Sequence, residues 1–180
     1  MITADTLQKK LEEKVINFSL LQYGKPYVHK SMGPDSFDCV TLAWYIYTSL
    51  FDIDLFQMGF GNSATTLAMT SCYGKITLYP EGDWDKDLSI LHSGDILFFH
   101  TQSLKDHYPK PNNRYPGHCG IYLENNYFIQ ANRTKGKVVI SNFNKNEYWK
   151  RVLVGSKNVI TDLISYQNSY PIEKEKSLIR

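Results

Sequence analysis

The first sign of chemistry in this sequence is Cys39, which ends the stretch GPDSFDC and precedes the apolar run of residues 40–51. The Gly-Pro turn and the capping residue Asp38 predict that a helix begins at this cysteine. Unpaired backbone N–H groups and the positive end of the helix dipole both favour a thiolate at such a position. A lone cysteine is more often a small core residue, but this context favours a thiol nucleophile at neutral pH.

A thiol nucleophile needs a base within hydrogen-bond reach and a further group that orients the base. The histidines that could serve are His29, His92, His100, His107 and His118. Of these, His118 alone lies inside a convincing strand pattern, in the segment GHCGIYL, where a rigid element can hold the imidazole. A histidine in a strand is usually only a half-buried polar residue, so the interpretation of His118 as the base depends on its neighbours.

The neighbours of His118 depend on the turn that follows its strand. A three-residue hairpin loop at residues 124–126 would pair His118 with Asn132. Gln130 would then lie diagonally opposite His118, where its amide can orient the imidazole. A two-residue turn would move Gln130 to the other face, scatter the apolar residues and leave Asn132 as the next candidate, so we favour the three-residue loop. The reverse face would then hold only residues suited to a core: Cys119, Ile121, Leu123, Tyr127, Ile129 and Ala131.

The elements around this site run from helices to strands, which predicts an α+β fold. An apolar period close to 3.6 predicts an amphipathic helix over residues 4–23. The helix that starts at Cys39 is apolar on every side, so we expect it to be central. Asn62 or Ser63 can cap a further short helix. Strand patterns occupy a short segment between residues 73 and 86 and then residues 96–100, 117–123, 127–131, 138–141 and 152–154, while residues 159–165 fit a short helix or strand.

The length and composition of the chain limit the number of its domains and the kinds of partner it can bind. With 180 residues, 42% of them hydrophobic, the chain can bury a core as a single domain. We expect that core at about residues 4–155, with residues 156–180 as a C-terminal extension. The 20 basic and 18 acidic side chains give a formal net charge of +2 without a long run of one sign. This balance indicates neither nucleic acid nor an anionic membrane as a partner.

The cysteines and the N-terminal residues indicate the cellular compartment in which the chain is expected to work. The three cysteines form no CxxC pair, which argues against a disulfide framework and a structural zinc site and favours reduced thiols. The N-terminus lacks a charged start followed by an apolar segment, and no stretch approaches about 18 consecutive apolar residues. The chain as it stands is therefore expected to be cytoplasmic and not membrane-spanning, unless it is part of a longer protein or reaches the cell wall by another export route.

Four segments in this order resemble the NlpC family of papain-like cell-wall cysteine peptidases: GKPYVHKSMGPDSFDCVTLAWYIY, SGDILFF, GHCGIYL and YFIQA. The resemblance covers about residues 20–140 and implies a papain-like fold, with the nucleophile helix packed on an antiparallel sheet. In that family the cysteine of the FDC motif is the nucleophile, the histidine of the H-x-G-I-Y strand is the base, and a polar residue on the next strand orients the base. The matching positions in this chain are Cys39, His118 and Gln130.

The activity that the resemblance implies is hydrolysis of peptide bonds in peptidoglycan stem peptides or muropeptides, without a metal or cofactor. The Cys39 thiolate would attack an amide carbonyl, and backbone N–H groups at the helix start would stabilise the oxyanion. His118 would protonate the leaving amine and then activate water.

Further positions match, or depart from, the family's substrate site. Tyr27 matches the tyrosine beside the nucleophile, and Asp38 matches the aspartate that helps to bind the amino end of the substrate. The family usually has Ser-Gly after the cysteine, where this chain has Val40 and Thr41. We therefore expect recognition of the substrate amine to differ, with Val40 in that part of the site. The orienting residue is more often histidine, and Gln130 can orient the base but cannot add charge.

Other interpretations of the same residues stay open. The departure after Cys39 also fits a degenerate scaffold that binds peptides without cutting them. A thiol amidase or acyltransferase on another amide or lipid is a second alternative, although the related permuted families place the histidine strand before the cysteine, and here Cys39 comes first. A zinc site made of Cys72, His118 and Cys119 is disfavoured by its spacing and by strand alternation.

The loop at residues 101–116 is longer than the family's usual link between these strands. It brings His107, Tyr108, Arg114 and Tyr115 to a position just before the strand of His118. The loop could therefore form a rim or lid over the site, with His107 and Arg114 as candidates for substrate contact, or be a tolerated surface insertion.

Overall fold

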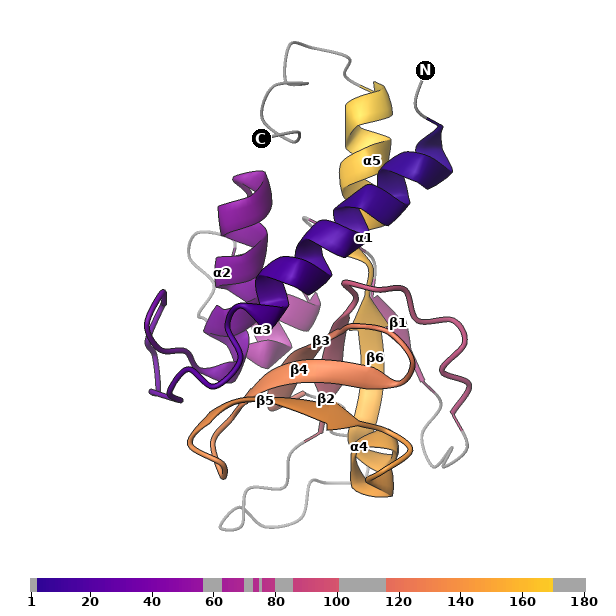
Figure 1. The fold of residues 1–180 in the computed structure, drawn as a ribbon. Coiled ribbons are helices and arrows are strands. Elements are labelled where there is room, and N and C mark those ends of the chain that lie inside the picture. Colours follow the sequence, from indigo (N-terminus) through magenta and orange to yellow (C-terminus); the bar gives the residue numbers. More distant parts are fainter. Residues whose placement is uncertain are drawn as a thin grey trace.

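The computed structural model describes residues 3–56, 63–69, 73–74, 76–79, 86–100 and 116–169, in which helices pack on an antiparallel sheet (Figure 1). In this part of the chain the sheet has six strands in the order β1-β6-β2-β3-β4-β5, and every neighbouring pair is antiparallel. The strands are β1 (Ile76–Leu78), β2 (Ile96–Phe99), β3 (His118–Tyr122), β4 (Tyr127–Asn132), β5 (Lys137–Asn142) and β6 (Leu153–Lys157). The helices are α1 (Ala4–Leu20), α2 (Cys39–Phe51), α3 (Ala64–Met69), α4 (Glu147–Val152) and α5 (Val159–Ser169). This is the α+β architecture that the sequence predicts.

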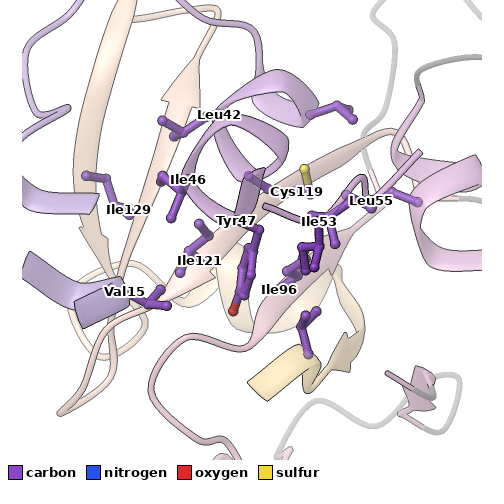
Figure 2. Packing of buried hydrophobic residues seen from close by; sticks show 14 of the residues in the cluster. Val15, Leu42, Ile46, Tyr47, Ile53, Leu55, Ile96, Cys119, Ile121 and Ile129 are labelled. Carbon is purple, nitrogen blue, oxygen red and sulfur yellow. The ribbon is translucent and has the colours of Figure 1, made fainter. Parts of the chain in front are cut away.

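The first core lies between the sheet and the helices α1, α2 and α5, which Figure 1 shows together on one side of the sheet. Val15 of α1, Ile46 of α2 and Ile121 of β3 are completely buried there. Figure 2 shows the side chains of α2 interleaved with those of the sheet strands. α5 packs against α1 and adds Val159 and Ile160 to the same core.

α2 has the bounds that the sequence predicts, and it is the central helix of the fold. Leu42 and Tyr47 lie on different sides of this helix, and both are almost completely buried. The Tyr47 hydroxyl donates a hydrogen bond to the backbone oxygen of Gly94, so this buried aromatic residue also ties α2 to the turn before β2. α2 ends at Asp52, which adopts the left-handed conformation typical of a helix C-terminus, with φ of 54°.

The hairpin between β3 and β4 has the predicted three-residue loop. Ile121 pairs with Ile129, and the Leu123 N–H donates to the Tyr127 oxygen at 2.9 Å, so the loop is residues 124–126. Asn125 and Asn126 accommodate the turn with positive φ angles. The predicted core face is therefore confirmed at Cys119, Ile121, Leu123, Ile129 and Ala131, whereas Tyr127 is 37% exposed at the end of the hairpin.

A second core lies on the opposite face of the sheet, which is the face that carries His118 and Gln130. The rings of Phe99 and Phe128 lie 5.1 Å apart there, and Phe143 lies 4.8 Å from Phe128. Trp149 of α4 packs edge-on to both Phe99 and Phe128. α4 covers this face, and no helix was predicted at its residues.

Some of the predicted features lie outside the described residues: Cys72 and most of the loop at 101–116, with His107 and Arg114. Among the helices of the described ranges, none has both the length and the apolar character needed to cross a bilayer.

Candidate active site

Cys39 is the first residue of α2, and Asp38 fixes the backbone around it. One carboxylate oxygen of Asp38 accepts from the Val40 and Thr41 amides at 3.0 and 2.9 Å, and the Thr41 hydroxyl accepts from the Asp38 amide at 2.9 Å. This reciprocal capping box is what starts the helix at the cysteine. The other Asp38 oxygen accepts from the Lys30 amide at 3.0 Å. Both oxygens of this buried carboxylate are thus bonded to the backbone; a contact with substrate stays a prediction.

His118 and Gln130 meet as the hairpin register predicts. The His118 Nε2 and the Gln130 Oε1 are 2.6 Å apart, and the Gln130 amide nitrogen donates to the Ser141 hydroxyl of β5 at 2.7 Å. Because the amide nitrogen is engaged with Ser141, the amide oxygen faces the ring and can accept only from a protonated Nε2. The imidazole is therefore held in one orientation, with Nδ1 as its remaining nitrogen. Ser141 was not predicted, because it lies across a different strand pair from His118.

The surroundings of Cys39 hold the pKa of its thiol at about 5, far below the ordinary value near 8.5. A hydrogen bond with the Cys119 thiol is the largest cause. Burial acts in the opposite direction, and hydrogen bonding with His118 and its charge lower the pKa further, against the repulsion from Asp38. Such a pKa favours the thiolate form of Cys39 at neutral pH, and His118 is one of the groups that lower it.

Cys119 is buried in the first core, as strand alternation predicts, but it also contacts the nucleophile position. Its Sγ donates to the Cys39 backbone oxygen at 3.0 Å. Hydrogen bonding with Cys39 and complete burial raise the pKa of Cys119 well above its usual range. Strand alternation indicates only which face a residue occupies; it does not indicate that the start of α2 lies against that face.

Tyr27 and Val40 occupy different environments beside the thiol. Burial and then the charges of Cys39 and Asp38 raise the pKa of the Tyr27 phenol, while Arg133 lowers it, so this half-buried hydroxyl lies in the field of the thiolate. Val40 is 5% exposed, with its side chain in the first core and its amide bonded to Asp38.

An aromatic cluster holds the other side of the His118 ring. The Phe99 ring and the Trp149 ring each lie 5.8 Å from the imidazole, centroid to centroid. Trp149 belongs to α4, and it was not predicted as part of the site because no helix was predicted there. The signal was nevertheless present, because Asn146 is a good N-cap and Glu147 is a favourable first-turn residue. Within the described ranges, no group of three or more His, Cys, Asp or Glu side chains is arranged to hold a metal ion.

Comparison with known proteins gives a consistent result. A model of the NlpC/P60 family matches residues 24–158. Murein DD-endopeptidase MepH of Escherichia coli strain K12 is 28% identical over 154 residues, which are 85% of this chain and 48% of MepH. This chain thus spans about half the length of that relative.

Solved structures share the fold. NlpC2 of Trichomonas vaginalis superposes with a TM-score of 0.59 at 26% identity, over 82% of this chain and 45% of NlpC2. The NlpC/p60 domain of the peptidoglycan hydrolase SagA has a TM-score of 0.56 at 17% identity, over 82% of this chain and 97% of that domain, a likeness of fold alone. Since the family match extends over most of the chain and includes Cys39, His118 and Gln130, this protein belongs to the NlpC/P60 family of papain-like cysteine peptidases.

Proposed function

We propose that this protein is a cysteine peptidase or amidase that hydrolyses peptide bonds in peptidoglycan stem peptides or muropeptides through Cys39, His118 and Gln130. The observation that carries the proposal is the 2.6 Å contact between His118 and Gln130, beside a helix start whose cysteine has a pKa of about 5. A thiolate, an adjacent base and a group that orients the base are the parts that covalent acyl transfer requires. Family membership supports peptidoglycan as the substrate class.

The first step is attack of the Cys39 thiolate on the amide carbonyl carbon, which pushes the carbonyl electron pair onto oxygen. Stabilisation of this oxyanion by several helix amides was expected, but Asp38 already accepts from the Val40 and Thr41 amides. No residue in the described part of the chain accepts from the Cys39 amide, which leaves it available for the oxyanion. The Tyr27 hydroxyl, which lies in the field of the thiolate, is our candidate for a second donor.

His118 transfers the protons. Its Nδ1 gives a proton to the leaving amine as the carbon–nitrogen bond breaks, and a thioester on Cys39 remains. The same nitrogen then takes a proton from water, whose oxygen attacks the thioester, and the acid product leaves as the thiolate is restored. Throughout this cycle Gln130 accepts from the Nε2 proton, and Ser141 holds Gln130 in place.

Recognition of the substrate amine should be weak at Asp38. Both carboxylate oxygens of Asp38 already accept backbone hydrogen bonds, and the residue is only 8% exposed. An ammonium group would have to compete with these bonds at the start of α2. We therefore propose that a free amino end on the stem peptide contributes less here than it does in relatives with Ser-Gly after the cysteine.

The experiment that tests this function is incubation of the purified protein with a panel of defined stem peptides and muropeptides, with and without a free amino end, followed by mass spectrometry of the products. Cleavage of one amide bond by the wild type, absent from the Cys39→Ala variant, is the expected result. If the wild type binds these peptides but cuts none of them, the protein is the peptide-binding scaffold instead.

A further inference from the structure

The structure places a second thiol directly against the nucleophile position. Cys119 lies in β3 and Cys39 at the start of α2, and both are free cysteines. The Cys119 Sγ donates to the Cys39 backbone oxygen at 3.0 Å, and each thiol shifts the pKa of the other. Figure 2 shows the Cys119 sulfur among the side chains of the first core. Cys119 is completely buried, whereas Cys39 is partly exposed.

We propose that Cys39 and Cys119 form an oxidation site at which a peroxide converts the two thiols into a reversible disulfide. The chemistry of this site requires only the two thiols and the peroxide, not peptide hydrolysis. Its consequence for activity rests on the proposed function, because a bridged Cys39 cannot attack an amide.

The proposed reaction has two steps. The Cys39 thiolate attacks one peroxide oxygen, a sulfur–oxygen bond forms as the oxygen–oxygen bond breaks, and the other oxygen leaves as water or an alcohol after taking a proton. Cys39 is then a sulfenic acid, oxidised by two electrons. The Cys119 sulfur attacks the Cys39 sulfur, the disulfide forms, and the hydroxyl group leaves with the Cys119 proton as water. An external dithiol returns both residues to thiols and is itself oxidised to a disulfide.

Burial and charge assign a different role to each cysteine. Cys39 is reachable by a small peroxide and is ionised at neutral pH, which makes it the sulfur that reacts first. Cys119 is sealed in the core and stays protonated, so a peroxide does not reach it directly. Its contact with Cys39 places it to trap the sulfenic acid before further peroxide converts it to the irreversible sulfinic acid.

The test treats the full, reduced chain with hydrogen peroxide, alkylates the remaining thiols, and maps the peptides by mass spectrometry. The wild type should give a peptide pair joined through Cys39 and Cys119, and dithiothreitol should restore both thiols. In Cys119→Val this pair cannot form, and Cys39 loses the largest cause of its low pKa, so it should react more slowly. The Cys39 that does react should pass to sulfinic and sulfonic acids that dithiothreitol does not reduce. In Cys39→Ser, the buried Cys119 should stay reduced under the same treatment.

A second variant controls for the possibility that Cys119→Val disturbs folding. Cys119→Ser keeps a donor for the Cys39 backbone oxygen but cannot form a bridge, so it should unfold at nearly the wild-type temperature and still lose Cys39 irreversibly. The proposal is overturned if the wild-type Cys39 passes to sulfinic acid as readily as that of the two variants, does not react, or pairs with Cys72. If the wild type hydrolyses muropeptides but forms no Cys39–Cys119 disulfide, the oxidation site is refuted and the proposed function is not. If the disulfide forms but the reduced wild type hydrolyses no muropeptide, only the proposed function is refuted.

Discussion

Asp95, directly before β2, is a carboxylate whose removal should stabilise the protein. It is 3% exposed, and one of its oxygens accepts from the His92 amide at 3.0 Å. The other oxygen is buried and has no hydrogen bond of normal geometry among the described residues, although the nearby Asn158 side chain slightly lowers the pKa of this carboxyl. Burial raises the pKa of Asp95 to about 6, against a smaller opposing effect of the His92 amide. The folded protein therefore carries an ionised, half-satisfied carboxylate at neutral pH.

The size of the expected stabilisation follows from the raised pKa of Asp95. The difference between about 6 in the folded protein and the ordinary value near 3.9 corresponds to about 3 kcal/mol against folding at neutral pH. Asp95→Asn removes this charge term, and the amide oxygen can keep the bond from His92. The amide nitrogen has to be accommodated where the unpartnered oxygen lies, so we expect a net gain of about 1–2 kcal/mol in the free energy of unfolding. For a chain of this length, that gain raises Tm by about 5 °C.

The pH dependence of the free energy of unfolding tests the sign of this effect. Since the folded-state pKa of Asp95 is raised, the stability contributed by its protonated form is present below about pH 4 and is lost as the pH rises through about 6. Chemical denaturation of the wild type and Asp95→Asn should therefore show a gain at about pH 8 that shrinks toward about pH 4. Asp87→Asn is the matched control, because hydrogen bonding with Ser89 lowers the pKa of that exposed carboxylate, and its removal should not stabilise. A variant no more stable than the wild type at about pH 8, or a gain equal at both pH values, would show that the ionised Asp95 does not destabilise the fold.

Three further predictions concern the site. The rate of iodoacetamide modification of Cys39, followed by peptide mapping at a series of pH values, should reach half its plateau near pH 5. The other two cysteines should react only at higher pH. Equal labelling of all three cysteines would count against Cys39 as a nucleophile. Gln130→Ala should lower muropeptide hydrolysis by roughly 10- to 100-fold, less than loss of the base, and an unchanged rate would remove Gln130 from its orienting role. Val40→Ser should sharpen the preference for a free amino end in competition assays while leaving the pH profile of alkylation unchanged; no change in preference would show that Val40 does not set it.

The local features of the site could be predicted from the sequence because short-range rules determine them. The Gly-Pro turn and Asp38 define the start of α2, and the capping box is observed where it was expected. The alternation of apolar residues selects the three-residue hairpin loop, and with that register Gln130 has to face His118. These inferences needed only periodicity, turn chemistry and one strand pair.

What could not be predicted depends on packing between segments that are distant in the sequence. The contact of Cys119 with Cys39 requires α2 to lie on β3, and the sequence reveals only that both surfaces are apolar. Ser141 supports Gln130 through the pairing of β4 with β5. α4 is short, and its position beside His118 is set by the contacts of Trp149 with the second core rather than by helix propensity.

The catalytic role of Cys39 and His118 can be tested by measuring muropeptide hydrolysis on one substrate between about pH 5 and 9. The proteins compared are the wild type, Cys39→Ala, His118→Ala and the double variant. Because nucleophile and base act as a unit, each single substitution should abolish hydrolysis to a similar degree, and the double variant should be little worse than either. Additive losses would contradict the assignment of a coupled pair. Hydrolysis that survives in Cys39→Ala, or a wild type that cuts no muropeptide anywhere in this range, would contradict the claim that Cys39 is a catalytic nucleophile.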